Sequence, residues 1–420
     1  MSKHVAIVGG GVVGLASAYA LVREGHEVSL CDSHAQVAQE TSFANGGQLS
    51  YRYVSPLADA GVPFKALAWM LQGDAAPLKF RLRLEPRQWR WCLSFLAACR
   101  SSVNQRNAGH LLRLALHSQQ VLGQWRAQDG LGDFAWRSNG KLVVYRNAGS
   151  LRQAAGKLSE VAGQRLLDAA QCLTLEPALE GMGGQLAGGI YSADDEVADC
   201  LRFCQVLEQR LQASGRYRRL GGSPVTGFEL ANGRIRALRL SEKCLAADAF
   251  VLAAGNHSAG LARSLGLHLP IYPLKGYSLT LPLVPGAIAP EVSVTDFDHK
   301  VVYARLDRQF RVAAMVDIGA RDAQPSAHRL SALRRLGERT FPHAGDYRQA
   351  EAWAGLRPCT PQGTPLLGAT TLSNLWLNSG HGSLGFTLAC ASGQILSELI
   401  SGRASPISLE GLSLPQCHSR

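Results

Sequence analysis

The alternation of apolar and polar positions divides the first part of the chain into a strand, a helix and a second strand. Residues 5–8 form a short apolar run that ends in glycines, as a buried parallel strand does. Residues 15–24 have helical periodicity and are followed by Gly25, and residues 27–32 form the next apolar run. These segments predict a β–α–β unit and therefore the α/β class.

The pattern changes between residues 61 and 150. Pro86 stands at a suitable first helical position, and the apolar residues after it share one helical face: Trp89, Cys92, Leu93 and Leu96. A second helix carries apolar residues from Leu111 to Trp125, and residues 140–146 return to a strand pattern. We expect this region to lie outside the first β–α–β unit.

Strand patterns also dominate the second half of the chain. Residues 248–253 form an apolar strand that runs into Gly255. Residues 277–284, 301–306 and 310–316 predict an antiparallel sheet. A final strand at 375–377 is followed by a glycine-rich loop and a helix at 387–400. No internal repeat or low-complexity tract interrupts this order.

The glycines after the first strand form a complete G-x-G-x-x-G pattern. Gly9 allows a tight turn, Gly11 lets a pyrophosphate approach the backbone, and Gly14 lets the helix pack against the strand. The helix that begins near Val12 and Val13 offers free N–H groups to phosphates. Asp32, followed by Ser33, ends the second strand at the separation expected for an acid that binds a ribose hydroxyl.

Two later glycine elements favour FAD over NAD. Ala254 and Gly255 follow a strand, and a loop from Gly380 to Gly385 leads into the last helix. The amides of that loop could stabilise negative charge on a reduced flavin. The loop residues are Gly380, His381, Gly382, Ser383, Leu384 and Gly385, with Thr387 in the helix. His381 is a lone histidine there, which is more often structural than a base.

We therefore predict an α/β fold: a Rossmann-type FAD-binding domain with an inserted α+β substrate domain built on an antiparallel sheet. The FAD-binding domain comprises residues 1–60, 151–270 and 351–420. The substrate-binding domain comprises residues 61–150 and 271–350. The 420 residues are too many for a single ordinary core, in agreement with two domains.

Composition and charge limit the partners, metal sites and cellular compartment that we expect. The formal net charge of +11 fits nucleic acid, an anionic membrane face or anionic small ligands. The ten cysteines have no metal-ligand spacing, so we expect no metal site. The chain begins without an apolar leader and has no long uninterrupted apolar segment. We expect a reduced, cytoplasmic protein with free thiols.

Several segments, taken together, resemble a known family. They are ETSFANGGQ at 40–48, PLKGYS at 273–278, GLRP at 355–358 and GHGSLG at 380–385. The chain resembles the D-amino-acid oxidase/glycine oxidase flavoprotein superfamily over essentially its whole length. Within that superfamily it is most similar to the small subunit of bacterial D-amino-acid dehydrogenases.

The resemblance implies specific roles. Arg357 would bind the substrate carboxylate, with Tyr277 and Tyr53 flanking the same pocket. Val225, in an expected strand at 223–225, would contact the adenine through its backbone. The FAD phosphates and isoalloxazine would be lined by Thr41, Ser42, Asn45, Gly46, Gly47, Gln48 and Leu49. Gln48 would also face the substrate.

The chain departs from these relatives near the pocket tyrosine. Tyr51 and Arg52 replace a Pro-Gly pair, and Leu57 replaces a tryptophan. Arg52 could attract an acidic side chain, although exposed arginines are commoner. We expect a preference for acidic or cyclic D-amino acids, of the D-glutamate or D-proline type.

The implied reaction is hydride transfer from Cα to flavin, giving an imino acid that water hydrolyses to a 2-oxo acid and ammonia. An arginine suits this chemistry because its planar fork pairs both carboxylate oxygens. No acid–base residue is assigned, because an amine that binds neutral does not require one.

Residues 79–100 combine arginines with tryptophans, the composition of an interfacial helix. A helix packed on the second domain with a basic outer face is at least as good an interpretation. If the segment contacts a membrane, the electrons would pass to a quinone or another respiratory acceptor.

Three alternatives remain open at this point. A glycine/sarcosine-type oxidase would use oxygen and make peroxide. A flavin-dependent RNA-modifying protein would fit the basic charge, but no aromatic-interleaved RNA-binding module is visible, so we expect no nucleic-acid partner. The third is a flavin-binding module without activity.

Overall fold

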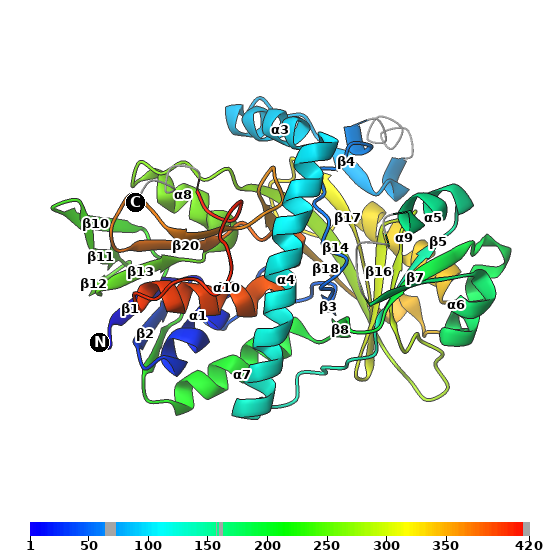
Figure 1. The fold of residues 1–420 in the computed structure, drawn as a ribbon, viewed down its shortest axis with the longest axis horizontal. Helices are drawn as coiled ribbons and strands as arrows, with labels where there is room; N and C mark the ends of the chain where they lie inside the picture. The colour runs from blue at the N-terminus through cyan, green and yellow to red at the C-terminus, as the bar shows by residue number, and fades with distance from the viewer. Residues whose placement is uncertain (64–72, 157, 159–162, 415–420) are drawn as a thin grey trace.

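The computed structural model describes residues 1–63, 73–156, 158 and 163–414, and two large sheets lie next to each other in it (Figure 1). The first has six strands in the order β19-β20-β13-β1-β2-β9, parallel except for the antiparallel pair β19 and β20. Its strands are β1 (His4–Val8), β2 (Glu27–Cys31), β9 (Tyr217–Leu220), β13 (Ala249–Leu252), β19 (Leu366–Ala369) and β20 (Leu375–Ser379). This sheet confirms the predicted α/β class.

Helices cover one face of this sheet. They are α1 (Val12–Arg23), α4 (Ser101–Asp129), α7 (Cys200–Ala213) and α10 (Gly385–Ile400), and their apolar side chains form one core. Figure 1 shows α4 crossing in front of α10. A Cβ atom on Gly393 of α10 would lie 2.6 Å from the carbonyl oxygen of Ala16 on α1. This glycine therefore permits the close approach of the two helices.

The other face of the first sheet is covered by α8 (Ser258–Arg263) and a small antiparallel sheet. That sheet consists of β10 (Gly227–Ala231), β11 (Arg234–Arg239) and β12 (Cys244–Ala246). Phe228, Phe250 and Ala262 meet in a second core between these layers. A parallel sheet buried on both faces explains why its strands are continuously apolar.

The last helical segment, Gly382–Ile400, is long and apolar enough to cross a bilayer. However, 67% of its most apolar part is buried inside the fold. It packs against α1 and α4. The burial identifies it as a core helix.

The second large sheet has nine strands and is mostly antiparallel. Its main path is β18-β14-β17-β16-β15-β5-β7-β6, and β4 pairs with β17. The strands are β4 (Leu78–Phe80), β5 (Lys141–Tyr145), β6 (Gln164–Leu167), β7 (Gly188–Ser192), β14 (Tyr272–Pro282), β15 (Ser293–Asp296), β16 (Val301–Leu306), β17 (Gln309–Ile318) and β18 (Glu351–Cys359). Its outer face packs on α9 (Ala327–Thr340). The helices α5 (Ala148–Ala155) and α6 (Ala169–Leu175) flank its far end, and β3 (Gln48–Leu49) pairs with β8 (Glu196–Val197) between the sheets.

The sheet pairings differ from the domain boundaries expected from the sequence. β6 and β7 fall within 151–270 and β18 within 351–420, yet all three belong to the second sheet. Conversely, α4 falls within 61–150 but packs in the core of the first domain. The domain to which a segment belongs depends on strand pairing between residues far apart in the sequence. The local pattern of residue types does not predict this pairing.

The helix predicted after Pro86 exists as α3 (Pro86–Ala98). Its buried face is opposite the one that carries Trp89, Leu93 and Leu96. Gln88, Trp91, Phe95 and Ala98 point inward, and Trp91 donates a hydrogen bond of 2.9 Å to the carbonyl of Cys359. The predicted apolar face is left outside: Trp89, Leu93 and Leu96 are exposed and Cys92 is partly exposed. Because α3 is apolar on both sides, the periodicity of its residues does not tell which face is buried.

Candidate active site

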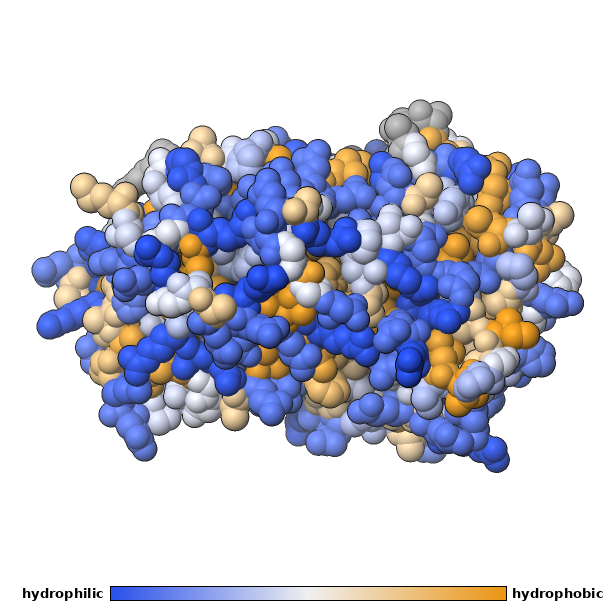
Figure 2. All heavy atoms as spheres, turned by 90° about the horizontal axis from the view of Figure 1, so that it is seen from below, coloured by the Kyte–Doolittle hydropathy of each residue, from blue (hydrophilic) through white to orange (hydrophobic). Residues whose placement is uncertain are grey.

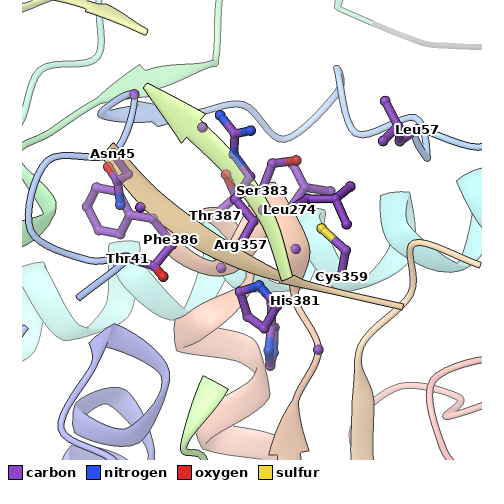
Figure 3. Close-up of a pocket in the computed structure, with 18 of the residues that line it drawn as sticks. Thr41, Asn45, Leu57, Leu274, Arg357, Cys359, His381, Ser383, Phe386 and Thr387 are labelled. Atoms are coloured by element: carbon purple, nitrogen blue, oxygen red, sulfur yellow. The ribbon is translucent and has the colours of Figure 1, made fainter. Parts of the chain in front are cut away.

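A cavity of 1460 Å³ lies between the two sheets and is lined by residues of both domains. Figure 3 shows part of its wall, where Thr41 and Asn45 come from the N-terminal third of the chain and Arg357, Ser383 and Thr387 from the C-terminal part. At one end is the glycine-rich turn after β1, and at the other the inner face of the second sheet. The described residues contain no cluster of side chains suited to a metal ion.

The turn after β1 is built for close approach of backbone atoms. Gly9 has φ of 114°, and a Cβ atom on Gly14 would lie 1.9 Å from the carbonyl oxygen of Gly9. A Cβ atom on Gly11 would meet only Ser42 Oγ, at 3.4 Å, so the remaining space beside it is cavity. Gly14 thus serves helix packing, while Gly11 leaves room for a ligand. The helix α1 begins with Val12 and Val13. Its N-cap residue is Gly11, which has no side chain to bond the first amides of the helix.

Asp32 follows β2 and lines the same end of the cavity, as does Ser33. Its carboxylate accepts hydrogen bonds from the amides of Gly10, at 2.5 Å, and His34, at 2.7 Å. These bonds fix the carboxylate next to the glycine turn. Its remaining lone pairs are available for a ribose hydroxyl.

The segment from Thr41 to Gln48 connects the two domains across the cavity. Thr41 Oγ1 donates to the carbonyl of Leu356 at 2.7 Å, and Ser42 Oγ accepts from the Val12 amide at 3.0 Å. The Gly47 amide donates to Asn45 Oδ1 at 3.1 Å. The structure brings the predicted cofactor residues of this segment to the cavity: Thr41, Ser42, Asn45, Gly46, Gly47 and Gln48. Leu49 is buried and does not line it.

The two later glycine elements also reach the cavity. Ala254 and Gly255 lie after β13, and residues 380–385 and Thr387 lie at the start of α10. His381 is buried, its Nε2 lies 3.0 Å from Ser392 Oγ, and burial lowers its pKa to about 3. It is therefore a neutral, structural histidine. Val225 lines the cavity from a loop; the strand expected at 223–225 is absent because β10 begins at Gly227.

Arg357 extends from β18 into the cavity (Figure 3). One of its five N–H donors binds the carbonyl of Met315 on β17, at 2.9 Å. Within the part of the chain that the structure describes, no carboxylate lies within ion-pair distance of it, and burial lowers its pKa. The guanidinium therefore keeps most of its donors for a bound anion.

The other residues predicted around the substrate line the cavity, with different partners and degrees of burial. Gln48 lines the cavity; its Nε2 donates to the carbonyl of Val294 at 3.2 Å. Tyr53 also lines it, and burial raises the pKa of Tyr53 to about 12. Arg52 lines it too, with Nη2 3.1 Å from Asp194. Leu57 lies at the rim, partly exposed.

Tyr277 does not present its hydroxyl to the cavity. The hydroxyl donates to Asp317 at 2.7 Å, and the ring belongs to the core between the second sheet and α9. Asp317 also pairs with Arg329 of α9 at 2.8 Å. A register shift between Lys275 and Tyr277 lies next to this residue on β14. Tyr277 nevertheless contributes to the lining of the cavity, so its place beside the substrate pocket stays a prediction.

Sequence reasoning missed Lys141, a cavity residue at the start of β5. Its ammonium donates to Gln48 Oε1 at 2.8 Å and to Ser50 Oγ at 2.6 Å. An isolated lysine in no motif gives no local signal. Only the pairing of β5 with β15 brings it to this cavity.

The comparisons with known proteins fit this geometry. The family model described as FAD dependent oxidoreductase matches residues 4–399. The chain belongs to this family. It is 53% identical to "D-amino acid dehydrogenase 2" of Pseudomonas aeruginosa and 44% identical to "D-amino acid dehydrogenase" of Paramagnetospirillum magneticum, covering 98% of each chain in both cases. Glycine oxidase from Geobacillus kaustophilus has the same fold, with a TM-score of 0.76, 21% identity and 99% of each chain covered.

The residues of this flavoenzyme fit FAD as its cofactor. The open space beside Gly11, at the N-terminus of α1, suits a pyrophosphate, and Asp32 suits the adenosine ribose. The turn that leads into α10 also lines the cavity, where the positive end of the helix dipole can stabilise negative charge. The predicted cofactor is thus consistent with the family and with the shape of the site.

Replacing Gly11 by valine should abolish FAD binding, because the side chain would fill the space next to the backbone where the pyrophosphate approaches. The purified variant should lack the yellow flavin absorbance while its circular dichroism stays close to that of the wild type. Gly123→Val is the matched control: Gly123 is exposed on α4, and a Cβ atom there meets nothing within 4 Å. A Gly11→Val protein that keeps stoichiometric FAD would contradict this placement of the cofactor.

Proposed function

We propose that this flavoenzyme is a D-amino-acid dehydrogenase that oxidatively deaminates a D-amino acid to the 2-oxo acid and ammonia. The names of the curated relatives support the substrate class, at 53% and 44% identity over nearly the whole chain. Bound FAD would accept the hydride from the substrate Cα. The single observation that carries the proposal is the cationic Arg357 in the cavity, without a carboxylate partner within ion-pair distance in the described part of the chain.

Arg357 would bind the α-carboxylate of the substrate through two parallel hydrogen bonds. Its bond to the Met315 carbonyl holds one edge of the guanidinium and leaves the other donors free. A planar, two-point contact orients the Cα–H bond toward one face of the flavin, and this selects one enantiomer. Tyr53 and Gln48 line the cavity around the same space.

The side-chain preference belongs to the same proposal. Acidic or cyclic D-amino acids, of the D-glutamate or D-proline type, are the proposed substrates. Arg52 supports the acidic class because it lines the cavity, although Asp194 already pairs with it at 3.1 Å.

We further propose that the electrons pass to a quinone or another respiratory acceptor at the inner face of the membrane. The support is the exposed surface of residues 82–96, which we call the α3 face: Leu82, Leu84, Trp89, Leu93 and Leu96. Arg81, Arg90 and Arg100 are exposed around it. Figure 1 shows α3 at the top of the molecule, whereas the face seen from below in Figure 2 is mostly hydrophilic with scattered hydrophobic groups.

An apolar helix face with a basic rim suits an anionic phospholipid surface. Residues 61, 62, 77, 78, 101 and 104, which flank α3 in the sequence, line the cavity. Docking through the α3 face would therefore bring the cavity close to membrane quinones. The second candidate, an oxygen-using amine oxidase with the fold of glycine oxidase, has no need of this surface.

Substitution of Arg357 tests the carboxylate contact. Arg357→Lys keeps the charge but loses the fork, so kcat/KM for flavin reduction should fall about tenfold to a hundredfold. Arg357→Ala should lose more, because the carboxylate would enter the cavity unpaired. FAD content should stay normal in both, and Arg348→Ala, at an exposed ion pair with Asp346, should change neither quantity. Anaerobic stopped-flow reduction measures the effect; wild-type kinetics in Arg357→Ala would refute the assignment.

The acceptor can be tested on the intact protein. A D-amino acid should bleach the flavin without air, and turnover with a soluble quinone analogue should be much faster than peroxide formation in air. Oxygen consumption and quinone reduction, measured side by side, give the two rates. Rapid peroxide formation in stoichiometric amounts would place the enzyme with the oxidases.

The α3 face predicts salt-sensitive membrane binding. The protein should sediment with phosphatidylglycerol-containing vesicles at low salt and dissociate at high salt, because screening weakens the basic contacts. Leu93→Glu combined with Leu96→Glu should abolish sedimentation and leave flavin reduction unchanged. Leu230→Glu combined with Val284→Glu, at exposed apolar residues elsewhere, should have no effect. Equal sedimentation of both variants would exclude the α3 face as the docking surface.

A further inference from the structure

Lys141 is a buried cation in the wall of the cavity. The residue is 2% exposed, and its ammonium touches two neutral acceptors, Gln48 Oε1 and Ser50 Oγ. The ammonium also lies 4.6 Å from the ring centroid of Tyr53. All four residues line the cavity, so the ammonium lies in the same space as the proposed substrate contacts.

Lys141 has no close ion-pair partner in the part of the chain that the structure describes, because no carboxylate there lies within ion-pair distance of its ammonium. Asp195 attracts it only over a longer distance, and one oxygen of Asp195 accepts from the Tyr51 amide at 2.9 Å. Burial lowers the pKa of Lys141 to about 8. A charge held in a buried place without a close counter-ion is unfavourable, and a bound anion would relieve it.

Other cations line the same part of the cavity. Arg52 and Lys300 both contribute to the wall, in addition to Arg357 and Lys141. The acidic lining residues are Asp32 and Glu40, which belong to the nucleotide end, and Asp59. Glu40 is engaged with His257, which lowers the pKa of its carboxyl. The substrate end therefore has a positive potential that favours anions.

Lys141 and Arg357 reach the same cavity from different strands of the second sheet. Arg357 extends from β18 past Gly276 of β14 to a carbonyl of β17. Lys141 extends from β5 to Gln48, whose amide binds the Val294 carbonyl on β15. Arg357 and Lys141 thus present two separate cations to one cavity, and an amino acid with a carboxylate at each end offers an anion to each of them.

We propose that Lys141 binds a side-chain carboxylate of the substrate, so that the enzyme selects acidic D-amino acids such as D-glutamate. This inference rests on the proposed function, in which Arg357 binds the α-carboxylate. Arg52 and Lys300 add long-range attraction and are not assigned a direct contact. Gln48 and Ser50 hold the ammonium in place while the substrate is absent.

The test compares D-glutamate with D-glutamine, which has the same shape but no side-chain charge. In the wild type, kcat/KM for flavin reduction should be at least about tenfold higher for D-glutamate. Lys141→Met should lower the value for D-glutamate about tenfold to a hundredfold, through KM, and leave that for D-glutamine nearly unchanged. Lys275→Met is the matched control: Lys275 is also buried in the second sheet, but pairs with Asp322 and does not line the cavity. It should not alter the ratio of the two substrates.

A second measurement needs no variant. Glutarate and pentanoate have chains of equal length, with two carboxylates and one respectively, and both can be titrated against the flavin absorbance of the wild type. Glutarate should bind at least about tenfold more tightly. Equal affinities, or a Lys141→Met variant that impairs D-glutamate and D-glutamine equally, would overturn the inference and leave a structural role through Gln48. Failure of every D-amino acid, including D-alanine and D-proline, to reduce the flavin would instead overturn the proposed function.

Discussion

The guanidinium of Arg357 occupies the space directly above Gly276 of the neighbouring strand. A Cβ atom at Gly276 would lie 2.3 Å from the guanidinium carbon, so any other residue there would displace the arginine. The carbonyl that holds it belongs to Met315, whose φ of 70° is in the left-handed region. A glycine, a bulged strand and a strained backbone together fix one cation, around which the proposed substrate end of the cavity is organised.

The same sheet also positions the cofactor end, through the segment that crosses between the domains. Ser278 on β14 donates to the carbonyl of Ala44, and Arg311 on β17 donates to that of Asn45. A Cβ atom on Gly46 would lie 3.3 Å from the side chain of Val302. The segment from Thr41 to Gln48, which lines the cavity, is therefore held by the second sheet. The proposed cofactor and substrate sites would then share one set of contacts, which would keep their relative position fixed.

Features determined by neighbouring residues were predictable from the sequence. The glycine turn, Asp32 and the loop at 380–385 follow from consecutive residue types, and the structure brings them to one cavity. Features determined by distant pairing were not. α3 is apolar on both faces, so periodicity could not tell which one is buried. The Tyr277 hydroxyl donates to Asp317 on the neighbouring strand, a partner that no local pattern indicates. Lys141 reaches the cavity through strand pairing alone.

The discontinuous domains have a consequence for biosynthesis. β20 and α10, near the end of the chain, complete the first sheet and its helical layer, and β18 forms an edge of the second sheet. During translation, the second sheet cannot be completed until residue 359 has left the ribosome, and the first domain not until residues close to 400 have done so. Strands made earlier, such as β1 and β13, therefore keep an unpaired edge or an uncovered face for part of translation. Such exposed surfaces favour aggregation. Production of this protein should accordingly depend more on chaperone capacity and slow synthesis than its final packing would suggest.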